Sequence, residues 1–312
     1  MTLTELKYVI AVAHERHFGR AAEQCNVSQP SLSVAVKKLE EELGIKIFER
    51  RSSDVTVTPI GSIIVEQAHR VLEEAQRIKE CAEQGKDPLS SPLHVGVIYT
   101  VAPYLLPPLV HQLRQSVPTM PLILTENYTS NLLESLRTGQ IDCAILALPI
   151  DQPGLMMHPL YDEEFIAAVP VEHRLAQQQT LSRQDLKNEP MLLLGSGHCF
   201  RDQVLDFCAD ALRGDASTRK QVEGSSLQTI GHMVAQGLGV TVLPASSVPY
   251  YKNEPLIKLM SFERSAVPKR RIVLLWRKSF PRTAAIEALN SAVGRLHMNG
   301  CKLLTSLPAV NA

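Results

Sequence analysis

The chain has 312 residues, of which 45% are apolar, and its 32 basic residues balance its 32 acidic residues. This length suits two or three domains, and the zero net charge excludes a polycation that binds nucleic acid through bulk charge. No apolar run is long enough to cross a membrane, and the first residues do not resemble a secretion signal. We therefore expect a cytoplasmic protein whose six cysteines are core residues or reactive thiols rather than a disulfide framework.

Three helices are predicted near the N-terminus. Apolar residues spaced by three and four predict the first helix over 3–16, and a short second helix follows over about 18–25. Asn26 can adopt the left-handed conformation that ends a helix, and Ser28 is a suitable N-cap for a third helix that runs to Gly44. A short helix, a three-residue turn and a longer helix form the helix-turn-helix arrangement.

A wing and a long helix are expected next. Two short strands at 45–48 and 55–58 flank a basic tip, and Pro59 then opens a helix that reaches about Gln84. The apolar positions of this helix alternate in spacings of four and three, as in a coiled coil: Ile64, Ala68, Val71, Ala75, Ile78 and Ala82. This pattern predicts a helix that pairs with a second copy; a helix packed on its own domain is the alternative.

After a linker-like segment at 85–92, predicted strands and helices alternate. The expected strands are 93–99, 122–126, 141–148, 165–169, 191–194, 240–243 and 272–276. The expected helices are 104–115, 131–137, 200–208, 226–236 and 284–297. This alternation predicts an α/β fold with parallel strands in two lobes, the first comprising about 92–163 and 269–300 and the second about 164–268.

The N-terminal half of the third helix carries two lysines and no acidic residue. Val34 is predicted to face outward, where it is a suitable partner for a thymine methyl group. The polar side chains there can bond base edges or phosphates, and the basic ones can bind phosphates. The candidate DNA-contacting residues are Gln29, Pro30, Ser31, Ser33, Val34, Lys37 and Lys38 of the helix and Arg50 and Arg51 of the wing. A three-helix protein–protein module is the alternative.

Residues 18–61, FGRAAEQCNVSQPSLSVAVKKLEEELGIKIFERRSSDVTVTPIG, closely resemble the winged helix-turn-helix signature of LysR-type transcriptional regulators. The resemblance implies a winged helix-turn-helix domain at 1–58 and a linker helix for dimerisation, with a hinge, at 59–91. It implies an effector-sensing domain at 92–312 that is similar to periplasmic binding proteins. It further implies a homodimer or homotetramer on double-stranded DNA in the nucleoid, with RNA polymerase as a partner.

Cys199 and Cys208 stand in a distinctive context, GSGHCFRDQVLDFC. Cys199 is expected at a helix N-terminus beside His198 and Arg201, and each of these features favours the thiolate. Asp202 is expected to orient Arg201 or His198. The alternative is that Cys199 is a small apolar residue at a helix start. Cys25 and Cys143 are interpreted as core residues. Cys81, on the linker helix, and Cys301, near a loose tail, are given no function.

The surroundings of these cysteines, together with GVIYTVAPYLLP, RTGQIDCAILALP and SSLQTIGHMVAQGLGVTVLP, resemble the hydrogen-peroxide-sensing members of the LysR family. The resemblance implies that hydrogen peroxide oxidises Cys199, the peroxidatic residue, to a sulfenic acid. It implies that Cys208, the resolving residue, then forms a disulfide with Cys199, which a cellular thiol reductant resets. The implied output is control of antioxidant genes.

The spacing of the two cysteines is itself informative. Nine residues of a helix rise by roughly 13 Å at ~1.5 Å per residue. A disulfide needs Cα atoms within about 7 Å. A bond between Cys199 and Cys208 therefore has to melt the helix that joins them.

A peroxide site also needs groups that hold the peroxide and stabilise the departing hydroxide. Thr100 and Thr129 each follow a predicted strand of the first lobe, at the carboxyl edge where α/β sheets bind ligands. Arg277 ends another predicted strand and is a further candidate, as a source of positive charge.

Two other functions stay open. One is a LysR-type regulator that binds a small metabolite between the two lobes, and the other is a thiol peroxidase, for which a DNA-binding module would serve no purpose. No Gly-rich phosphate loop is present and the histidines are scattered, so neither a cofactor nor a metal is expected. We therefore expect a regulator rather than an enzyme.

Overall fold

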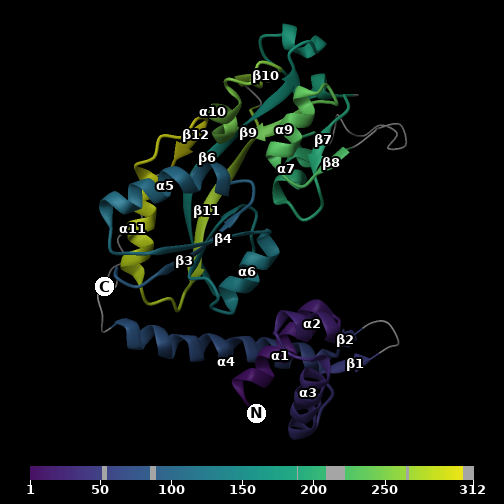
Figure 1. Cartoon of the computed structure of the whole chain (residues 1–312), viewed down its shortest axis with the longest axis vertical. Coiled ribbons are helices and arrows are strands. Elements are labelled where there is room, and N and C mark those ends of the chain that lie inside the picture. Colours follow the sequence, from purple (N-terminus) through teal and green to yellow (C-terminus); the bar gives the residue numbers. More distant parts are fainter. Residues whose placement is uncertain (51–54, 85–88, 188, 209–221, 265–266, 305–312) are drawn as a thin grey trace. The chain divides into compact units, whose positions relative to one another are not determined.

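The computed structural model describes residues 1–50, 55–84, 89–187, 189–208, 222–264 and 267–304 (Figure 1). The chain forms two compact units, one built on the N-terminal residues through helix α4 together with residues 137–140, and the other on the remaining described residues beyond 88. No helix in these ranges is both long and apolar enough to span a membrane. The two units are described in turn.

The N-terminal unit begins with the three predicted helices. They are α1 (Leu3–Glu15), α2 (Phe18–Gln24) and α3 (Gln29–Leu43). Ser28 caps α3 by accepting a hydrogen bond from the Ser31 amide, and Asn26 has the left-handed φ of 55° that the turn requires. Leu32, Val36 and Leu39 of α3 are buried in the core of this unit. The helix-turn-helix arrangement is therefore confirmed.

The wing begins three residues later than predicted. Strand β1 (Phe48–Arg50) pairs antiparallel with β2 (Val55–Val57), so the prediction of a strand over 45–48 was wrong. The reason is the buried Glu40 of α3, whose carboxylate accepts hydrogen bonds from the amides of Ile47 and Phe48 at 2.8 and 3.0 Å. Because Glu40 of α3 binds these amides, the strand begins only at Phe48. The tip at 51–54 lies outside the described residues.

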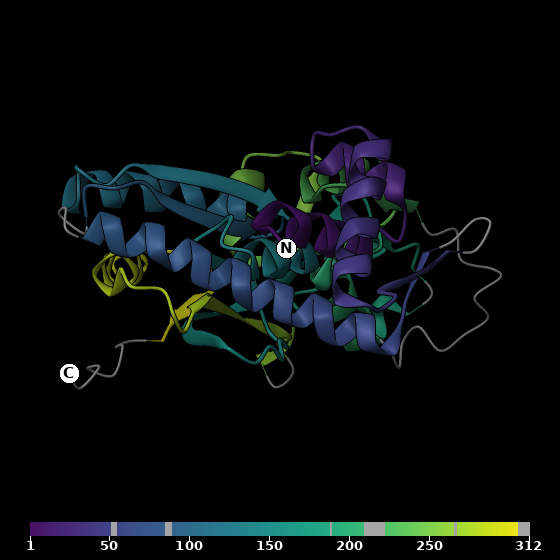
Figure 2. The ribbon, with the colours of Figure 1, turned by 90° about the horizontal axis from the view of Figure 1, so that it is seen from below.

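Helix α4 (Pro59–Gln84) runs unbroken over the predicted span (Figure 2). Its first half belongs to the core of the N-terminal unit, because Ala68 and Leu72 are buried against that core and α4 packs on α1. The alternative of a helix packed on its own domain thus holds for this half. On the outer side of α4, Val71 is 41% exposed and Ile78 is 73% exposed. These two predicted seam residues remain at the surface.

The second unit contains one large mixed sheet and one small sheet. The strands of the large sheet lie in the order β10 (Ile257–Met260), β6 (Leu155–Pro170), β11 (Lys269–Arg277), β5 (Cys143–Ala147), β3 (Leu93–Ile98) and β4 (Leu122–Asn127). Two further strands, β9 (Thr241–Pro244) and β12 (Cys301–Leu303), also pair with β6. The small sheet pairs β7 (Leu192–Leu194) in parallel with β8 (Val222–Gly224).

The prediction of wholly parallel sheets was wrong. Strands β3, β4 and β5 are parallel, but β11 runs antiparallel to both β5 and β6. Strand β6 carries the chain from the first lobe into the second, and β11 carries it back, so the two strands run in opposite directions.

Strand β6 is continuous through both lobes and has 16 residues. Residues 155–164 pair with β11, whereas 165–170 pair with β9 and β10. The predicted strand over 165–169 was therefore only the second half of β6, and the predicted lobe boundary at 163–164 falls inside it. Cys301, predicted near a loose tail, instead opens β12 and pairs with Glu163 of β6.

Helices pack on the sheets of the second unit. Helices α5 (Ala102–Ser116) and α11 (Thr283–Gly294) contact each other beside the large sheet (Figure 1). The others are α6 (Thr129–Arg137), α7 (Cys199–Phe207), α9 (Leu227–Ala235) and α10 (Val248–Tyr251), with short 3-10 turns η1 (Arg174–Gln177), η2 (Arg183–Leu186) and η4 (Ala245–Ser247). The apolar residues form one core in each lobe.

The exposed part of α4 predicts a test of pairing between copies. Replacing Val71 and Ile78 together with Lys should give monomers, because buried unpaired charges would face each other across a helix pair. Sedimentation measures the result. Glu66→Lys changes the net charge by the same amount at an exposed residue of α4 outside the predicted seam and should leave assembly intact. An unchanged sedimentation profile for the double variant would rule the pairing out.

Candidate functional site

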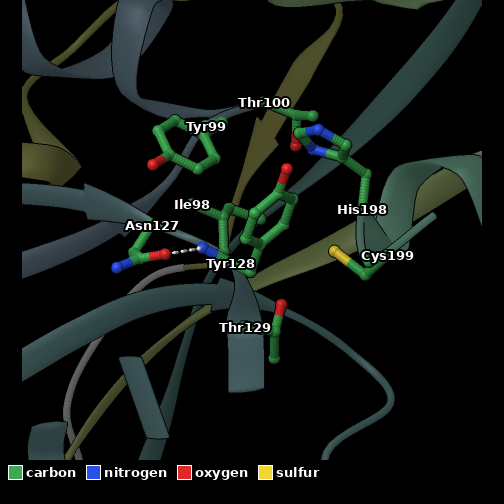
Figure 3. A pocket seen from close by; sticks show the side chains of 9 residues that line it. Ile98, Tyr99, Thr100, Asn127, Tyr128, Thr129, His198 and Cys199 are labelled. Atoms are coloured by element: carbon green, nitrogen blue, oxygen red, sulfur yellow. Dashed lines mark hydrogen bonds between the residues drawn. The ribbon is translucent and has the colours of Figure 1, made fainter. Parts of the chain in front are cut away.

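A small pocket forms where the carboxyl ends of β3 and β4 meet the N-terminus of α7 (Figure 3). Its lining residues are Ile98, Tyr99, Thr100, Asn127, Tyr128, Thr129, Gly197, His198 and Cys199. Four residues predicted from separate parts of the sequence are among them: Thr100, Thr129, His198 and Cys199. The pocket therefore unites groups that the sequence spreads over a hundred positions.

Local structure explains why these side chains meet. Thr100 follows β3 directly after Tyr99, and Thr129 is the first residue of α6, just past β4. His198 is the N-cap residue of α7 and Cys199 is the first residue of that helix. Gly197 has a φ of 95°, a left-handed conformation that favours glycine, and this turn brings the chain from β7 back toward the pocket.

Two polar atoms at the pocket are buried and have no hydrogen-bond partner among the described residues: Oγ1 of Thr129 and Nε2 of His198. Burial lowers the pKa of His198, against the effect of a hydrogen bond with the Ser225 backbone, so the imidazole is neutral near pH 7. Such unpaired buried atoms cost free energy unless a ligand or water satisfies them. They indicate that the pocket is built to hold a small polar molecule.

The pocket is very small. The space open to the centre of a water-sized molecule is ≈ 10 Å³. A cavity of roughly 10–15 Å³ on this measure holds about one water. No cluster of three or more metal-ligating side chains occurs in the described parts of the chain. The site therefore suits a ligand of very few atoms.

Arg270, which the sequence analysis did not single out, supports the pocket from below. Its side chain is fully buried and forms an ion pair with Glu163 at 2.7 Å. Its Nη1 donates to the hydroxyl of Thr100 at 2.8 Å, and its Nη2 donates to the Thr100 carbonyl at 3.0 Å. The guanidinium also lies 4.7 Å from the centre of the Phe200 ring, one residue beyond Cys199. Arg270 thus connects Thr100, which follows β3, to α7, the helix that begins at Cys199.

Electrostatics tie Arg270 to Cys199 as well. Burial would lower the pKa of the Arg270 guanidinium, but the negative charges of Glu163 and of an ionised Cys199 outweigh burial and raise it. In the folded strand Arg270 alternates with the exposed Lys269 and Arg271 and so faces inward.

Arg277 was predicted at this site, and the structure places it elsewhere. Its buried guanidinium donates to the carbonyls of Leu136 and Ile141 at 2.6 and 2.7 Å. Because β11 is antiparallel to β5, its end lies at the amino edge of the parallel strands and its beginning at the carboxyl edge. The pocket therefore receives Arg270 from the start of β11 rather than Arg277 from its end.

Arg201 and Asp202 also differ from expectation. The guanidinium of Arg201 donates to the Leu194 carbonyl at 2.8 Å and forms an ion pair with Glu223. Arg201 does not line the pocket, and its ionic partner is Glu223 rather than Asp202, which is exposed. The basic residue beside Cys199 in the sequence thus anchors α7 to β8.

The two key cysteines belong to different cores. Cys199 is partly buried and packs against the core of the first lobe, whereas Cys208 is fully buried in the core of the second. Burial raises the pKa of Cys208 to about 11. Burial likewise raises the pKa of Cys143 and Cys301, and Cys301 donates a weak hydrogen bond to Glu163 at 3.9 Å. These three thiols are therefore protonated at neutral pH.

The remaining two cysteines lie in the N-terminal unit. Cys25 is half-buried and packs against the core of that unit, and burial raises its pKa. The side chain of Cys81 is not among those described.

The surface of α3 presents the candidate DNA-contacting residues. Val34 is 67% exposed, which is unusual for a valine without a partner. Lys37 and Lys38 are exposed and lie 3.5 Å from the carboxylates of Glu41 and Glu5. Ser33 is half-buried, while the first turn of α3 is exposed: Gln29, Pro30 and Ser31. Arg50 ends β1 but its side chain is not described, and Arg51 lies outside the described residues.

Two family descriptions match the chain. "Bacterial regulatory helix-turn-helix protein, lysR family" matches residues 3–62, and "LysR substrate binding domain" matches residues 86–295. The chain belongs to the LysR family.

Within the LysR family, the chain is similar to OxyR proteins over most of its length. The "DNA-binding transcriptional dual regulator OxyR" of Escherichia coli K12 is 40% identical over 301 residues, which covers 96% of this chain and 97% of that protein. Full-length OxyR from Pseudomonas aeruginosa, solved with aspartate in place of one cysteine, has a TM-score of 0.71 and 46% identity and covers 99% of both chains. A cysteine variant of Corynebacterium glutamicum OxyR, solved with hydrogen peroxide bound, has a TM-score of 0.64 and 36% identity and covers 94% of this chain and 92% of that one.

The α3 surface predicts two separable effects on DNA binding. Lys37→Ala should weaken binding to all sequences and reduce the slope of log affinity against log salt by about 0.9, because one phosphate contact is lost. Val34→Ala should change the preferred sequence and leave the slope unchanged. Lys7→Ala removes the same charge from the exposed side of α1 and serves as the control. Equal affinities of the three variants and the parent for one promoter at all salt concentrations would contradict the α3 assignment.

The buried ion pair predicts a specific pattern of stabilities. Arg270→Gln should lower the free energy of unfolding by about 3–5 kcal/mol, because it leaves the Glu163 carboxylate buried without a counter-charge. Adding Glu163→Gln should restore part of that loss. Urea unfolding measures both effects, and Arg271→Gln, in an exposed pair with Asp162, should change little. Simple additivity of the two single effects would show that the pair is not coupled.

Proposed function

We propose that this protein is a DNA-binding transcription regulator that senses hydrogen peroxide through Cys199. The observation that carries the proposal is the pocket: a partly buried thiol, a buried arginine behind it, and unpartnered polar atoms enclose space for a molecule of very few atoms. Hydrogen peroxide has two heavy atoms and both donates and accepts hydrogen bonds. Its binding would satisfy atoms that the protein leaves without partners.

The chemistry follows from the residues at the pocket. The thiolate of Cys199 attacks one peroxide oxygen, the O–O bond breaks, and the sulfur is oxidised to a sulfenic acid while the second oxygen leaves as hydroxide. That hydroxide takes up the proton released when the thiol ionised and becomes water. The Thr100 hydroxyl accepts from Arg270, so its own proton is free to donate into the pocket. Thr129 and His198 supply further hydrogen bonds to the bound peroxide.

The second step forms the disulfide. The Cys208 thiol attacks the sulfenic sulfur, a disulfide forms, and a second water leaves. Because the two thiols lie in different cores at the two ends of α7, they cannot meet while this helix is intact. Melting α7 releases the Phe200 ring from Arg270 and the Gln203 side chain from the Leu148 carbonyl. Oxidation therefore disturbs the contacts that α7 makes with Arg270 of β11 and with Leu148, which follows β5.

The rest of the chain supplies the output. The unit at 1–58 would read double-stranded DNA through α3 and the wing, the segment at 59–91 would join copies into dimers and tetramers, and residues 92–312 would sense peroxide. Repacking around α7 would change how the copies assemble on a promoter, and so their contact with RNA polymerase at antioxidant genes. We place this activity in the cytoplasm, at the nucleoid, where thiol reductants reset the disulfide.

The two alternatives make different demands on the protein. A regulator of an ordinary metabolite needs a larger site than the ≈ 10 Å³ beside Cys199. A thiol peroxidase would consume peroxide in many turnovers, whereas a sensor consumes about one equivalent per disulfide. Peroxide consumption by the whole protein, measured with excess thiol reductant, distinguishes these two.

The decisive experiment maps the thiols after a stoichiometric dose of peroxide. Cys199→Ser should abolish peroxide-dependent transcription, because the attacking sulfur is missing. The matched controls Cys25→Ser, Cys81→Ser, Cys143→Ser and Cys301→Ser should respond normally. Mass spectrometry of the parent protein should show a bond between Cys199 and Cys208. Loss of the response in any of the four controls would contradict the assignment.

Hydrogen exchange on the same oxidised samples tests the switch itself. Backbone amides of α7 should lose protection on oxidation, because the helix must open for the bond to form. Cys208→Ser keeps the first oxidation and prevents the second, so α7 should stay protected in that variant. Equal protection of 199–208 in the reduced and disulfide-bonded protein would refute the melting of α7.

A further inference from the structure

Two tyrosine rings form the rim of the pocket. Tyr99 and Tyr128 pack edge to face with ring centres 5.3 Å apart. The centre of the Tyr128 ring lies 4.8 Å from that of His198, and the Tyr99 ring lies 6.0 Å from it. In Figure 3 the Tyr128 ring stands between Tyr99 on one side and His198 and Cys199 on the other. The approach to the sulfur is therefore bordered by three aromatic rings.

The backbone fixes the position of the Tyr128 ring. The Tyr128 amide donates to the Asn127 side chain at 2.8 Å, and the Tyr128 carbonyl accepts from the Leu132 amide in the first turn of α6. On its other side, the ring faces Gly197, where a Cβ would lie 3.4 Å from Cδ1 of the ring. These contacts fix the backbone of Tyr128, and Gly197 leaves room for its ring beside the turn before α7.

The two rim tyrosines, Tyr99 and Tyr128, are not residues of the hydrophobic core. Tyr99 is 39% exposed, and Tyr128 is only partly buried. Neither belongs to the buried core clusters of the described residues. Both rings instead line the small pocket beside Cys199.

This size limit matters for the group that leaves in the first oxidation. A thiolate attacks the terminal oxygen of a hydroperoxide, the O–O bond breaks, and the other oxygen leaves with its substituent. With hydrogen peroxide the leaving group is hydroxide, which becomes water. With an alkyl hydroperoxide it is an alkoxide, which becomes an alcohol, and its carbon atoms need room on the side of the pocket away from the sulfur.

We propose that Tyr128, supported by Tyr99, is a specificity-determining residue that restricts the Cys199 pocket to hydrogen peroxide and excludes alkyl hydroperoxides by size. The inference rests on the proposed function, because it presupposes that Cys199 reacts with a peroxide. It adds a substrate restriction that the reaction itself does not require.

The test compares rates of Cys199 oxidation in the full-length protein with hydrogen peroxide and with tert-butyl hydroperoxide. Rapid quenching with an alkylating reagent and mass spectrometry of the Cys199 peptide give both rate constants. The parent protein should prefer hydrogen peroxide. Tyr128→Ala should raise the relative rate with tert-butyl hydroperoxide by about tenfold or more, since misfit of even one carbon is worth roughly 10–200-fold in a close-fitting pocket. Tyr128→Phe, which keeps the ring, should behave as the parent does.

Each outcome bears on a separate claim. No reaction of the parent protein with hydrogen peroxide overturns the proposed function. A parent that reacts equally fast with both peroxides overturns the size restriction and leaves the proposed function standing. An unchanged rate ratio in Tyr128→Ala, or the same shift in Tyr128→Phe, also overturns it. If Tyr128→Ala fails to fold, Tyr99→Ala at the more exposed ring decides: a shifted ratio supports the restriction and an unchanged one overturns it.

Discussion

The sensing site depends on a buried ion pair between Arg270 and Glu163. Neither side chain has any exposed surface, so every charged atom must find a partner inside the protein. The guanidinium bonds both Glu163 and Thr100, and the carboxylate also accepts from the Ser246 amide. The Phe200 ring covers the guanidinium. Because these partners come from separate elements, the ion pair holds Thr100, strand β6 and helix α7 in one arrangement.

The same arrangement explains how a change at one sulfur can reach a whole lobe. Phe200 is adjacent to Cys199, and its ring also packs against Phe165 of β6 at 5.0 Å between centres. Strand β6 passes through both lobes, and the other strands that pair with it come from each of them. Opening α7 in the proposed switch therefore removes an aromatic contact from a strand that runs through both lobes.

Sequence reasoning predicted the local elements well, because caps, turns and apolar spacing act within a few residues. Ser28, Asn26 and Gly44 define α3, and they do so in the structure. It failed where the outcome depends on distant partners. The amides of Ile47 and Phe48 are bound by Glu40, and the direction of β11 depends on the path of the chain through the second lobe.

Sequence reasoning likewise predicted only some residues of the candidate site. Thr100 and Thr129 follow strands whose carboxyl ends meet at one edge, so their meeting with His198 and Cys199 in one pocket could be expected from topology. Topology inferred from the sequence did not show which of Arg270 and Arg277 reaches the pocket. They lie at opposite ends of β11, and the direction of this strand decides which end lies at the carboxyl edge of the parallel strands. The sequence analysis assigned no role to the two tyrosines at the rim, and only the folded chain brings them together.

The first half of α4 has a consequence for how a signal can reach DNA. Ala68 and Leu72 are part of the same core as α1 and α3, so the N-terminal unit and this part of α4 form a single packed piece. In a dimer paired along α4 there is then no joint between the pairing helix and α3. A small rotation of one α4 against the other would therefore produce a larger displacement of α3, because α3 moves together with α4. It would alter the distance between the two α3 helices of the dimer relative to one turn of B-DNA, about 34–36 Å.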